Sequence, residues 1–132
     1  VSPEATLTYK PTPDLTLFAA YKEGFKSGSF DIAPITNLAL LAGPRELRFD
    51  SESAKGFEVG FKSLLFDNQL RINAAYYDYK YEGLQVNAFD SNTAATRVLN
   101  VAGATTRGVD FDAQYAPNSL PGLVFNAAIN YN

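Results

Sequence analysis

Residues 55–79, KGFEVGFKSLLFDNQLRINAAYYDY, decide how the chain folds. Apolar and polar side chains alternate in the first part, where Phe57 and Val59 are set against Glu58 and Lys62. The alternation resumes after DNQ, three residues of the kind that builds tight turns. A period of two is the pattern of a β-strand with one apolar face, so the stretch predicts two antiparallel strands joined by a short turn.

The same alternation recurs along the whole chain. Six strands are expected, at about residues 4–10, 15–25, 55–66, 70–79, 109–115 and 123–131. PTPD, DNQ and PNSLPG join them in pairs, while longer connections span residues 27–50 and about 90–97. Short turns therefore lie at one end of every hairpin and long loops at the other. This asymmetry is typical of a transmembrane β-barrel, whose tilted strands cross the bilayer in roughly 9 to 11 residues.

Composition excludes several classes of site. The chain contains no cysteine and no histidine, so it has no disulfide, thiolate nucleophile or Ser-His-Asp triad, and it lacks the commonest transition-metal ligand. The formal net charge is −3 and the 11 basic residues are scattered, unlike the clustered basic residues of a nucleic-acid-binding surface. We therefore expect no catalytic residue, no metal or cofactor site and no nucleic-acid partner.

The apolar pattern also bears on how the chain meets a membrane. No apolar run approaches the roughly 18 to 20 residues that a spanning helix needs. A closed sheet needs apolar residues only at alternate positions, because its backbone groups pair between strands. The sequence thus predicts an all-β fold, an antiparallel transmembrane β-barrel. Since it starts without methionine and stops within an alternating run, we expect an excerpt of about six consecutive strands from a larger barrel.

Energetics indicate which set of side chains faces lipid. Near the middle of the bilayer a lipid-facing Lys or Arg costs roughly 2 to 4 kcal/mol, and Asp or Glu somewhat less. The charged residues expected to line the lumen, in phase with Gly56 and Gly60, are Glu58, Lys62, Arg71, Asp110 and Asp112. The residues expected to face lipid are Phe57, Val59, Phe61, Ile72, Val109, Phe111, Phe125 and Ile129. So polar an inner face suits a wide lumen better than a small, filled one.

Arg107 does not fit this division. Simple parity places it on the lipid side with Val109. Two explanations are open: a bulge at the neighbouring Gly108 could shift the phase, or the arginine could lie high enough to reach lipid headgroups.

The long loops begin where the strands change character. Residues 21–30, YKEGFKSGSF, keep aromatic residues while they gain charges and glycines. Aromatic residues suit the headgroup region, so this stretch is expected to mark the exit from lipid toward the outside. Three charged residues of the connection at 27–50 are candidates for contact with an extracellular ligand: Arg45, Glu46 and Arg48.

Other interpretations compete with the barrel. A soluble β-sandwich that binds carbohydrate or serves adhesion would also alternate, but its strands are usually shorter. Asp110 and Asp112 have a spacing near that of paired catalytic carboxylates, but lumen charges hydrogen-bonded to neighbouring strands or to the plug are the favoured explanation. The tyrosines at 76, 77, 79 and 81 could form a stacking platform for a ligand, but an interfacial belt with at least one face lining the mouth is favoured. Residues 90–92 suit either a cation site or a turn.

Three longer stretches carry a family resemblance. They are YKPTPDLTLFAAYKEGFKSGSF at 9–30, FDSESAKGFEVGFKSLLFDNQLRINAAYYDYKYEGLQV at 49–86, and NVAGATTRGVDFDAQYAPNSLPGLVFNAAINY at 100–131. In wording and in order they resemble the β-barrel of the TonB-dependent outer-membrane receptors. The resemblance covers essentially the whole chain.

The resemblance implies more than periodicity does. It implies a 22-stranded barrel closed around an N-terminal plug domain, in the outer membrane of a Gram-negative bacterium. Such receptors bind a scarce nutrient, typically a ferric siderophore, and import it with energy relayed by the TonB complex. The plug, the TonB box and the remaining strands are expected to lie outside this sequence. The expected partners are therefore the TonB complex, outer-membrane lipid and a ferric siderophore or a similar nutrient.

Overall fold

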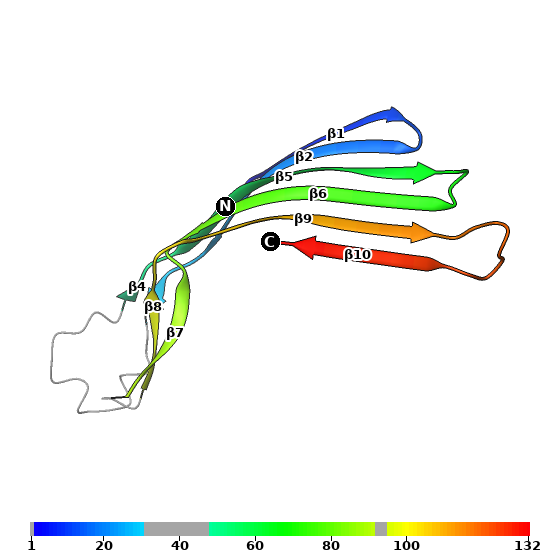
Figure 1. Cartoon of the computed structure of the whole chain (residues 1–132). Helices are drawn as coiled ribbons and strands as arrows, with labels where there is room; N and C mark the ends of the chain where they lie inside the picture. Colours follow the sequence, from blue (N-terminus) through cyan, green and yellow to red (C-terminus); the bar gives the residue numbers. More distant parts are fainter. Residues whose placement is uncertain (1, 31–47, 92–94) are drawn as a thin grey trace, which may run out of the picture.

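A computed structural model describes residues 2–30, 48–91 and 95–132. Its main feature is one antiparallel sheet of six strands in the order β1-β2-β5-β6-β9-β10 (Figure 1). The strands are β1 (Glu4–Thr12), β2 (Leu15–Lys26), β5 (Glu52–Leu65), β6 (Leu70–Glu82), β9 (Ala104–Tyr115) and β10 (Phe125–Tyr131). All six expected strands are thus present. They lie side by side in the sheet in the same order in which they occur in the sequence.

Two small hairpins extend from one end of this sheet. β3 (Ser29–Phe30) pairs with β4 (Arg48–Phe49), and β7 (Gln85–Asp90) pairs with β8 (Ala95–Asn100). Figure 1 shows β4, β7 and β8 together at the end opposite the three short turns. The expected arrangement of short turns at one end and long connections at the other is confirmed.

The expected boundary of the second long connection is wrong. The sequence predicts it at about residues 90–97, whereas the chain leaves the large sheet after Glu82 and rejoins it at Ala104. Gly83 has a φ of +65°, a left-handed conformation that interrupts the strand. The alternation beyond it belongs to β7 and β8, which form a sheet of their own.

The DNQ turn is built from an unusual run of left-handed residues. Phe66, Asp67 and Asn68 have φ values of 54°, 54° and 67°. Asp and Asn tolerate this conformation better than most residues, because their side chains form local hydrogen bonds. Gln69 links the turn to the next one: its Nε2 donates to the Phe66 carbonyl at 2.9 Å, and its Oε1 accepts from the Asn118 N–H at 2.9 Å.

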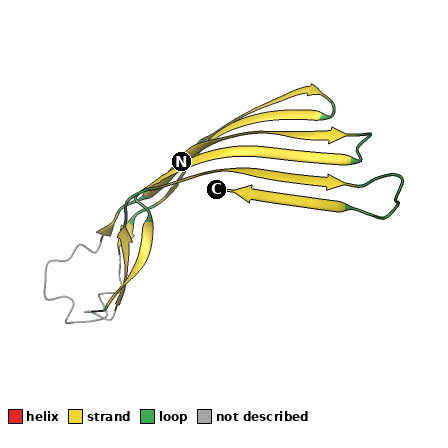
Figure 2. Cartoon of the chain, in the orientation of Figure 1, coloured by secondary structure: helices red, strands yellow, loops and turns green. Residues whose placement is uncertain are grey.

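The large sheet is a single layer. Every described element is a strand (Figure 2), and among the described residues only Ala20, Gly108 and Pro117 are buried. A β-sandwich would need a second sheet packed about 10 Å from the first, and no such sheet covers either face in the described part of the chain. The described residues include no helix long and apolar enough to span a membrane.

Candidate functional site

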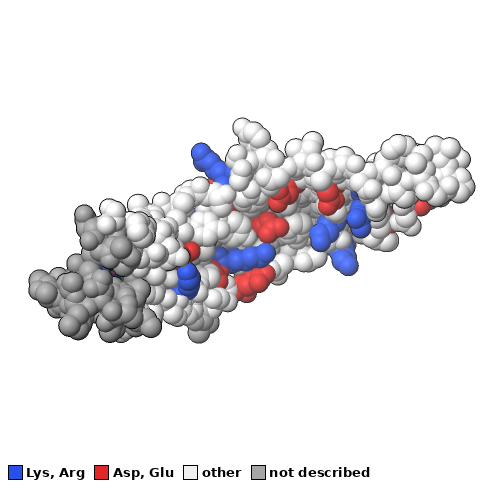
Figure 3. All heavy atoms as spheres, turned by 90° about the horizontal axis from the view of Figure 1, so that it is seen from below, with Lys and Arg blue, Asp and Glu red and all other residues white. Residues whose placement is uncertain are grey.

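The strand register assigns each side chain to one of two faces. Residues directly opposite each other in neighbouring strands point to the same side of a sheet. Lys62 is opposite Asn73, and Asn73 is opposite Asp112. The same reasoning places all five expected lumen residues on one face, which we call the polar face: Glu58, Lys62, Arg71, Asp110 and Asp112. Figure 3 shows acidic and basic side chains interleaved along this face.

Side chains of neighbouring strands bind the carboxylates of the polar face. Asn73 Nδ2 donates to both oxygens of Asp112, at 3.0 and 2.6 Å, and Asn130 Nδ2 donates to Asp110 Oδ1. Glu58 pairs with Lys22, with 3.3 Å between Oε2 and Nζ. The two aspartates of β9 therefore bond to amide side chains of β6 and β10, the strands on either side. These hydrogen bonds explain the two carboxylates without a catalytic role.

The polar face is hollowed at its centre. A cavity of about 530 Å³ opens there, and its lining combines charged and amide residues with Phe18 and with further apolar residues, among them Ala75, Ala128 and Ile129. Lys62 Nζ lies 6.0 Å from the centroid of the Phe18 ring, within the range of a cation–π contact. Arg71 lines a second hollow of about 360 Å³, nearer the short turns, beside Gln114 and Asn126. Charge and space for water thus coincide on one side of the sheet.

The opposite side is an apolar face. One row across it runs from Leu17 through Phe61, Ala74 and Phe111 to Ile129. The side chains expected to face lipid all share it: Phe57, Val59, Phe61, Ile72, Val109, Phe111, Phe125 and Ile129. Several are well exposed, Ile129 at 63% and Phe125 at 52%. A face of this kind needs an apolar environment.

Arg107 lies on the apolar face, at its outer edge. Pairing between β6 and β9 runs without a shift from Ala104 to Tyr115, so no bulge at Gly108 changes the phase. Arg107 is opposite Asp78, and the next row outward holds Glu23, Lys55 and Lys80. The register thus excludes the first of the two explanations and leaves the arginine beside other charges, outside the uncharged rows.

The tyrosines divide between the faces. Tyr77, Tyr79 and Tyr81 lie on the polar face, and the rings of Tyr77 and Tyr79 have centroids 6.3 Å apart. Tyr76 lies on the apolar face, 5.9 Å from the Phe57 ring. Neither a single platform nor a single belt therefore accounts for all four.

The loop candidates are only partly within the described chain. Arg45, Glu46 and Asn92 lie outside the described residues, as does the side chain of Asp90. Arg48 is in β4, where its Nη2 lies 3.2 Å from Asp50 Oδ1 and its side chain is 67% exposed. No group of three or more acidic residues that could hold a metal ion occurs in the described ranges.

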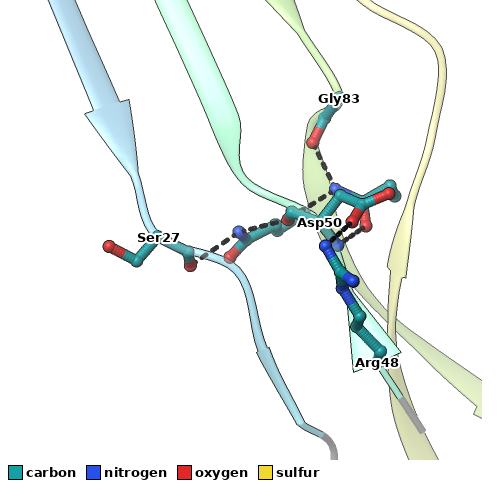
Figure 4. A network of polar contacts seen from close by, with 6 residues as sticks. Ser27, Arg48, Asp50 and Gly83 are labelled. Atoms are coloured by element: carbon teal, nitrogen blue, oxygen red, sulfur yellow. Dashed lines mark hydrogen bonds and ion pairs between the residues drawn. The ribbon is translucent and has the colours of Figure 1, made fainter.

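Sequence reasoning missed a network of amide side chains at the outer end of the sheet (Figure 4). Asn100 Oδ1 accepts from the Asp50 N–H at 2.6 Å, and its Nδ2 donates to the Asp50 and Gly83 carbonyls at 2.9 and 2.8 Å. Gln85 Nε2 donates to the Asp50 and Ser27 carbonyls at 2.9 and 3.1 Å. Neither residue stands out from the polar residues of its connection, so periodicity gave no signal for them.

Comparisons with known proteins agree with this geometry. Residues 1–132 match the family model "TonB dependent receptor-like, beta-barrel". The chain is 28% identical over 127 residues to the ferric-pyoverdine 358 receptor of Pseudomonas putida, a match that covers 92% of this chain and 14% of that protein. The chain therefore spans about a seventh of that relative.

Two solved structures share the fold. The alcaligin outer-membrane receptor FauA of Bordetella pertussis superposes with a TM-score of 0.62 at 19% identity, over 98% of this chain and 21% of that one. The siderophore receptor PirA of Acinetobacter baumannii also gives 0.62, at 14% identity, over 98% and 22% of the two chains. Because the family model matches residues 1–132, the chain belongs to the β-barrel family of TonB-dependent receptors, which lie in the Gram-negative outer membrane.

Proposed function

We propose that the chain is part of a receptor that binds a ferric siderophore outside the cell and imports it across the outer membrane. The family match supports a receptor of the TonB-dependent type, and similar proteins include receptors for ferric pyoverdine and alcaligin. The proposed partners are the TonB complex, acting through a plug domain outside this sequence, and outer-membrane lipid. The proposed function contains no covalent step.

The separation of charge in the sheet supports this proposal most. Glu58, Lys62 and Asp110 share one face with a cavity of about 530 Å³, and the mid-sheet rows of the other face hold no charge. A wet lumen on one side and lipid on the other would favour such a sheet, since a lipid-facing charge costs about 2 to 4 kcal/mol near the midplane. We propose that Glu58, Lys62, Arg71, Asp110 and Asp112 line that lumen.

Capture of the ligand is assigned to the outer loops. Arg48 is well exposed in the β3–β4 hairpin, at the end of the sheet opposite the short turns. A guanidinium group binds carboxylate and other oxygen anions through two parallel hydrogen bonds. Arg48 is therefore proposed as a contact for an anionic group of the ligand.

Growth and binding test the function. A strain that lacks the whole receptor gene should lose growth on at least one ferric siderophore under iron limitation, and the intact gene should restore it. The purified full receptor should bind that complex, and removal of the TonB box should abolish uptake but not binding. Growth that is unaffected on every ferric siderophore tested would contradict the proposal.

A further inference from the structure

Four strand ends meet where the two outer hairpins leave the large sheet. β2 ends at Lys26 and β5 begins at Glu52, on either side of the β3–β4 hairpin. β6 ends at Glu82 and β9 begins at Ala104, on either side of the β7–β8 hairpin. The position of each hairpin therefore depends on what joins these four ends.

Asn100 joins the two hairpins through the backbone of Asp50. Its amide accepts from the Asp50 N–H and donates to the Asp50 carbonyl, at 2.6 and 2.9 Å, so it pairs with one residue as a neighbouring strand would. The same Nδ2 donates to the Gly83 carbonyl at 2.8 Å. Asn100 thus fixes the end of one hairpin to the beginning of the other.

Gln85 adds a second set of bonds from the other strand of the hairpin. Its Nε2 donates to the carbonyls of Asp50 and Ser27, which lie just outside the two strands of the β3–β4 stem. Its backbone N–H donates to Glu52 Oε2 at 3.0 Å. Figure 4 shows the dashed bonds of the network, which connect the surroundings of Asp50 with Ser27 on one side and Gly83 on the other. The Asp50 carbonyl accepts from both amides and so uses both of its lone pairs.

Two glycines, Gly28 and Gly83, fit the backbone of this junction closely. A Cβ on Gly28 would lie 2.8 Å from the Asp50 carbonyl carbon and 2.9 Å from the Ser51 nitrogen, closer than side-chain atoms approach a backbone. Gly83 holds a positive φ that turns its carbonyl toward Asn100. The close approach and the turn both favour the bonded arrangement over alternatives.

We propose that Gln85 and Asn100 are positioning residues that hold the β3–β4 stem and the β7–β8 hairpin as one body, so that both hairpins present a single ligand-binding surface. The ligand part of this inference rests on the proposed function, whereas the coupling of the hairpins stands on the hydrogen bonds alone. Arg48 lies within the coupled unit, and its salt bridge to the Asp50 side chain connects its guanidinium to the residue that both amides bind.

The coupling can be measured without a ligand. Spin labels at Phe30→Cys and Phe89→Cys, two well-exposed positions in β3 and β7, report the separation of the hairpins in the full receptor freed of other cysteines. A narrow distance distribution is expected for the parent, and one at least twice as broad, by rough estimate, for the Q85A/N100A variant. The control is N87A, an amide of β7 with no side-chain hydrogen bond within the described ranges, and it should leave the distribution unchanged.

A milder variant guards against misfolding. N100D keeps the acceptor for the Asp50 N–H and loses both Nδ2 donations, so it should broaden the distribution while the barrel still assembles into a heat-modifiable band. An unchanged distribution in both Q85A/N100A and N100D would overturn the inference.

Binding distinguishes this inference from the proposed function. With ferric pyoverdine and ferric alcaligin as probes, Q85A/N100A should bind about tenfold more weakly than the parent, whereas N87A should not. A short bis-maleimide bridge between the two cysteines should restore affinity to the uncoupled variant, which a loss of folding would not allow. If Q85A/N100A broadens the distance distribution but binds the probes as tightly as the parent, the inference that the coupled hairpins present one ligand-binding surface is overturned. If the parent binds neither probe, the proposed function is contradicted for these ligands and the distances alone decide the coupling.

Discussion

The ring of Phe18 lies across Gly60 of the neighbouring strand. The two residues are opposite each other on the polar face, and a Cβ on Gly60 would stand 2.7 Å from Cζ of the ring. Tyr77 and Gly108 repeat the arrangement, with 2.7 Å between the added Cβ and the tyrosine oxygen. Glycine in a strand costs stability unless something else packs in its place. On the polar face, aromatic rings fill that space.

Gly60→Ala is therefore expected to destabilise the barrel. The new methyl group would crowd the Phe18 ring and the adjacent backbone, and overpacking of this kind typically costs about 1 to 3 kcal/mol. Urea unfolding of the full receptor in lipid vesicles would measure the loss. The control is Gly24→Ala on the same face, where nothing lies within 4 Å of an added Cβ. Equal effects of the two substitutions would contradict the packing explanation.

Adjacent alanines of β6 test the two faces. Ala74 is opposite Phe61 and Phe111 on the apolar face, whereas Ala75 is opposite Gly60 and Asp110 on the polar face. Ala74→Arg should lower the free energy of unfolding by about 2 to 4 kcal/mol, because the guanidinium would face lipid. Ala75→Arg, with Asp110 opposite, should cost less than about 1 kcal/mol. The same vesicle measurement compares them, and similar penalties would count against the division of faces.

The Asn73–Asp112 bond predicts a pH-dependent variant. Asn73→Asp places two carboxylates opposite each other, and their repulsion at about 4 Å should cost roughly 1 kcal/mol at pH 7. Protonation of one carboxyl removes the repulsion, so stability should return as pH falls toward about 4, where carboxyl groups take up protons. Gln114→Glu, opposite Arg71 and Asn126, is the control and should show no gain at low pH. The free energy of unfolding measured from pH 7 to pH 4 tests this. A variant that regains no stability at low pH would contradict the prediction.

Arg107 predicts a gradient of cost with depth. Arg107→Leu should change stability by less than about 1 kcal/mol, because an arginine at the outer edge can reach headgroups. Arginine at Phe111, four residues further into the apolar face, should cost about 2 to 4 kcal/mol, and at Val109 an intermediate amount. Unfolding of the three variants in vesicles would show the gradient, and equal costs at 109 and 111 would argue against the assigned depth.

The long strands and their faces could be predicted from the sequence, because a period of two depends only on local order. Phe57, Glu58 and Val59 reveal their sides without any knowledge of partners. The phase of Arg107 could not be predicted, since it depends on an unbroken register with β6 that no single strand encodes.

The outer junction shows a second limit. Asn100 bonds Asp50, 50 residues away in the chain, and the contact depends on the left-handed turn at Gly83. A long-range contact between one amide and a backbone group leaves no periodic trace. The same turn separates β7 and β8 from the large sheet, and the alternation of their residues alone does not reveal this separation.

The central claim is that the apolar face contacts acyl chains while the polar face contacts water. Spin labels placed one at a time at positions 57, 58, 59, 61 and 62 of the full receptor in lipid vesicles test it most directly. Labels at 57, 59 and 61 should be accessible to oxygen, and those at 58 and 62 to a water-soluble nickel reagent. Accessibility that does not alternate from one position to the next would contradict the assignment of faces and the barrel wall built on it.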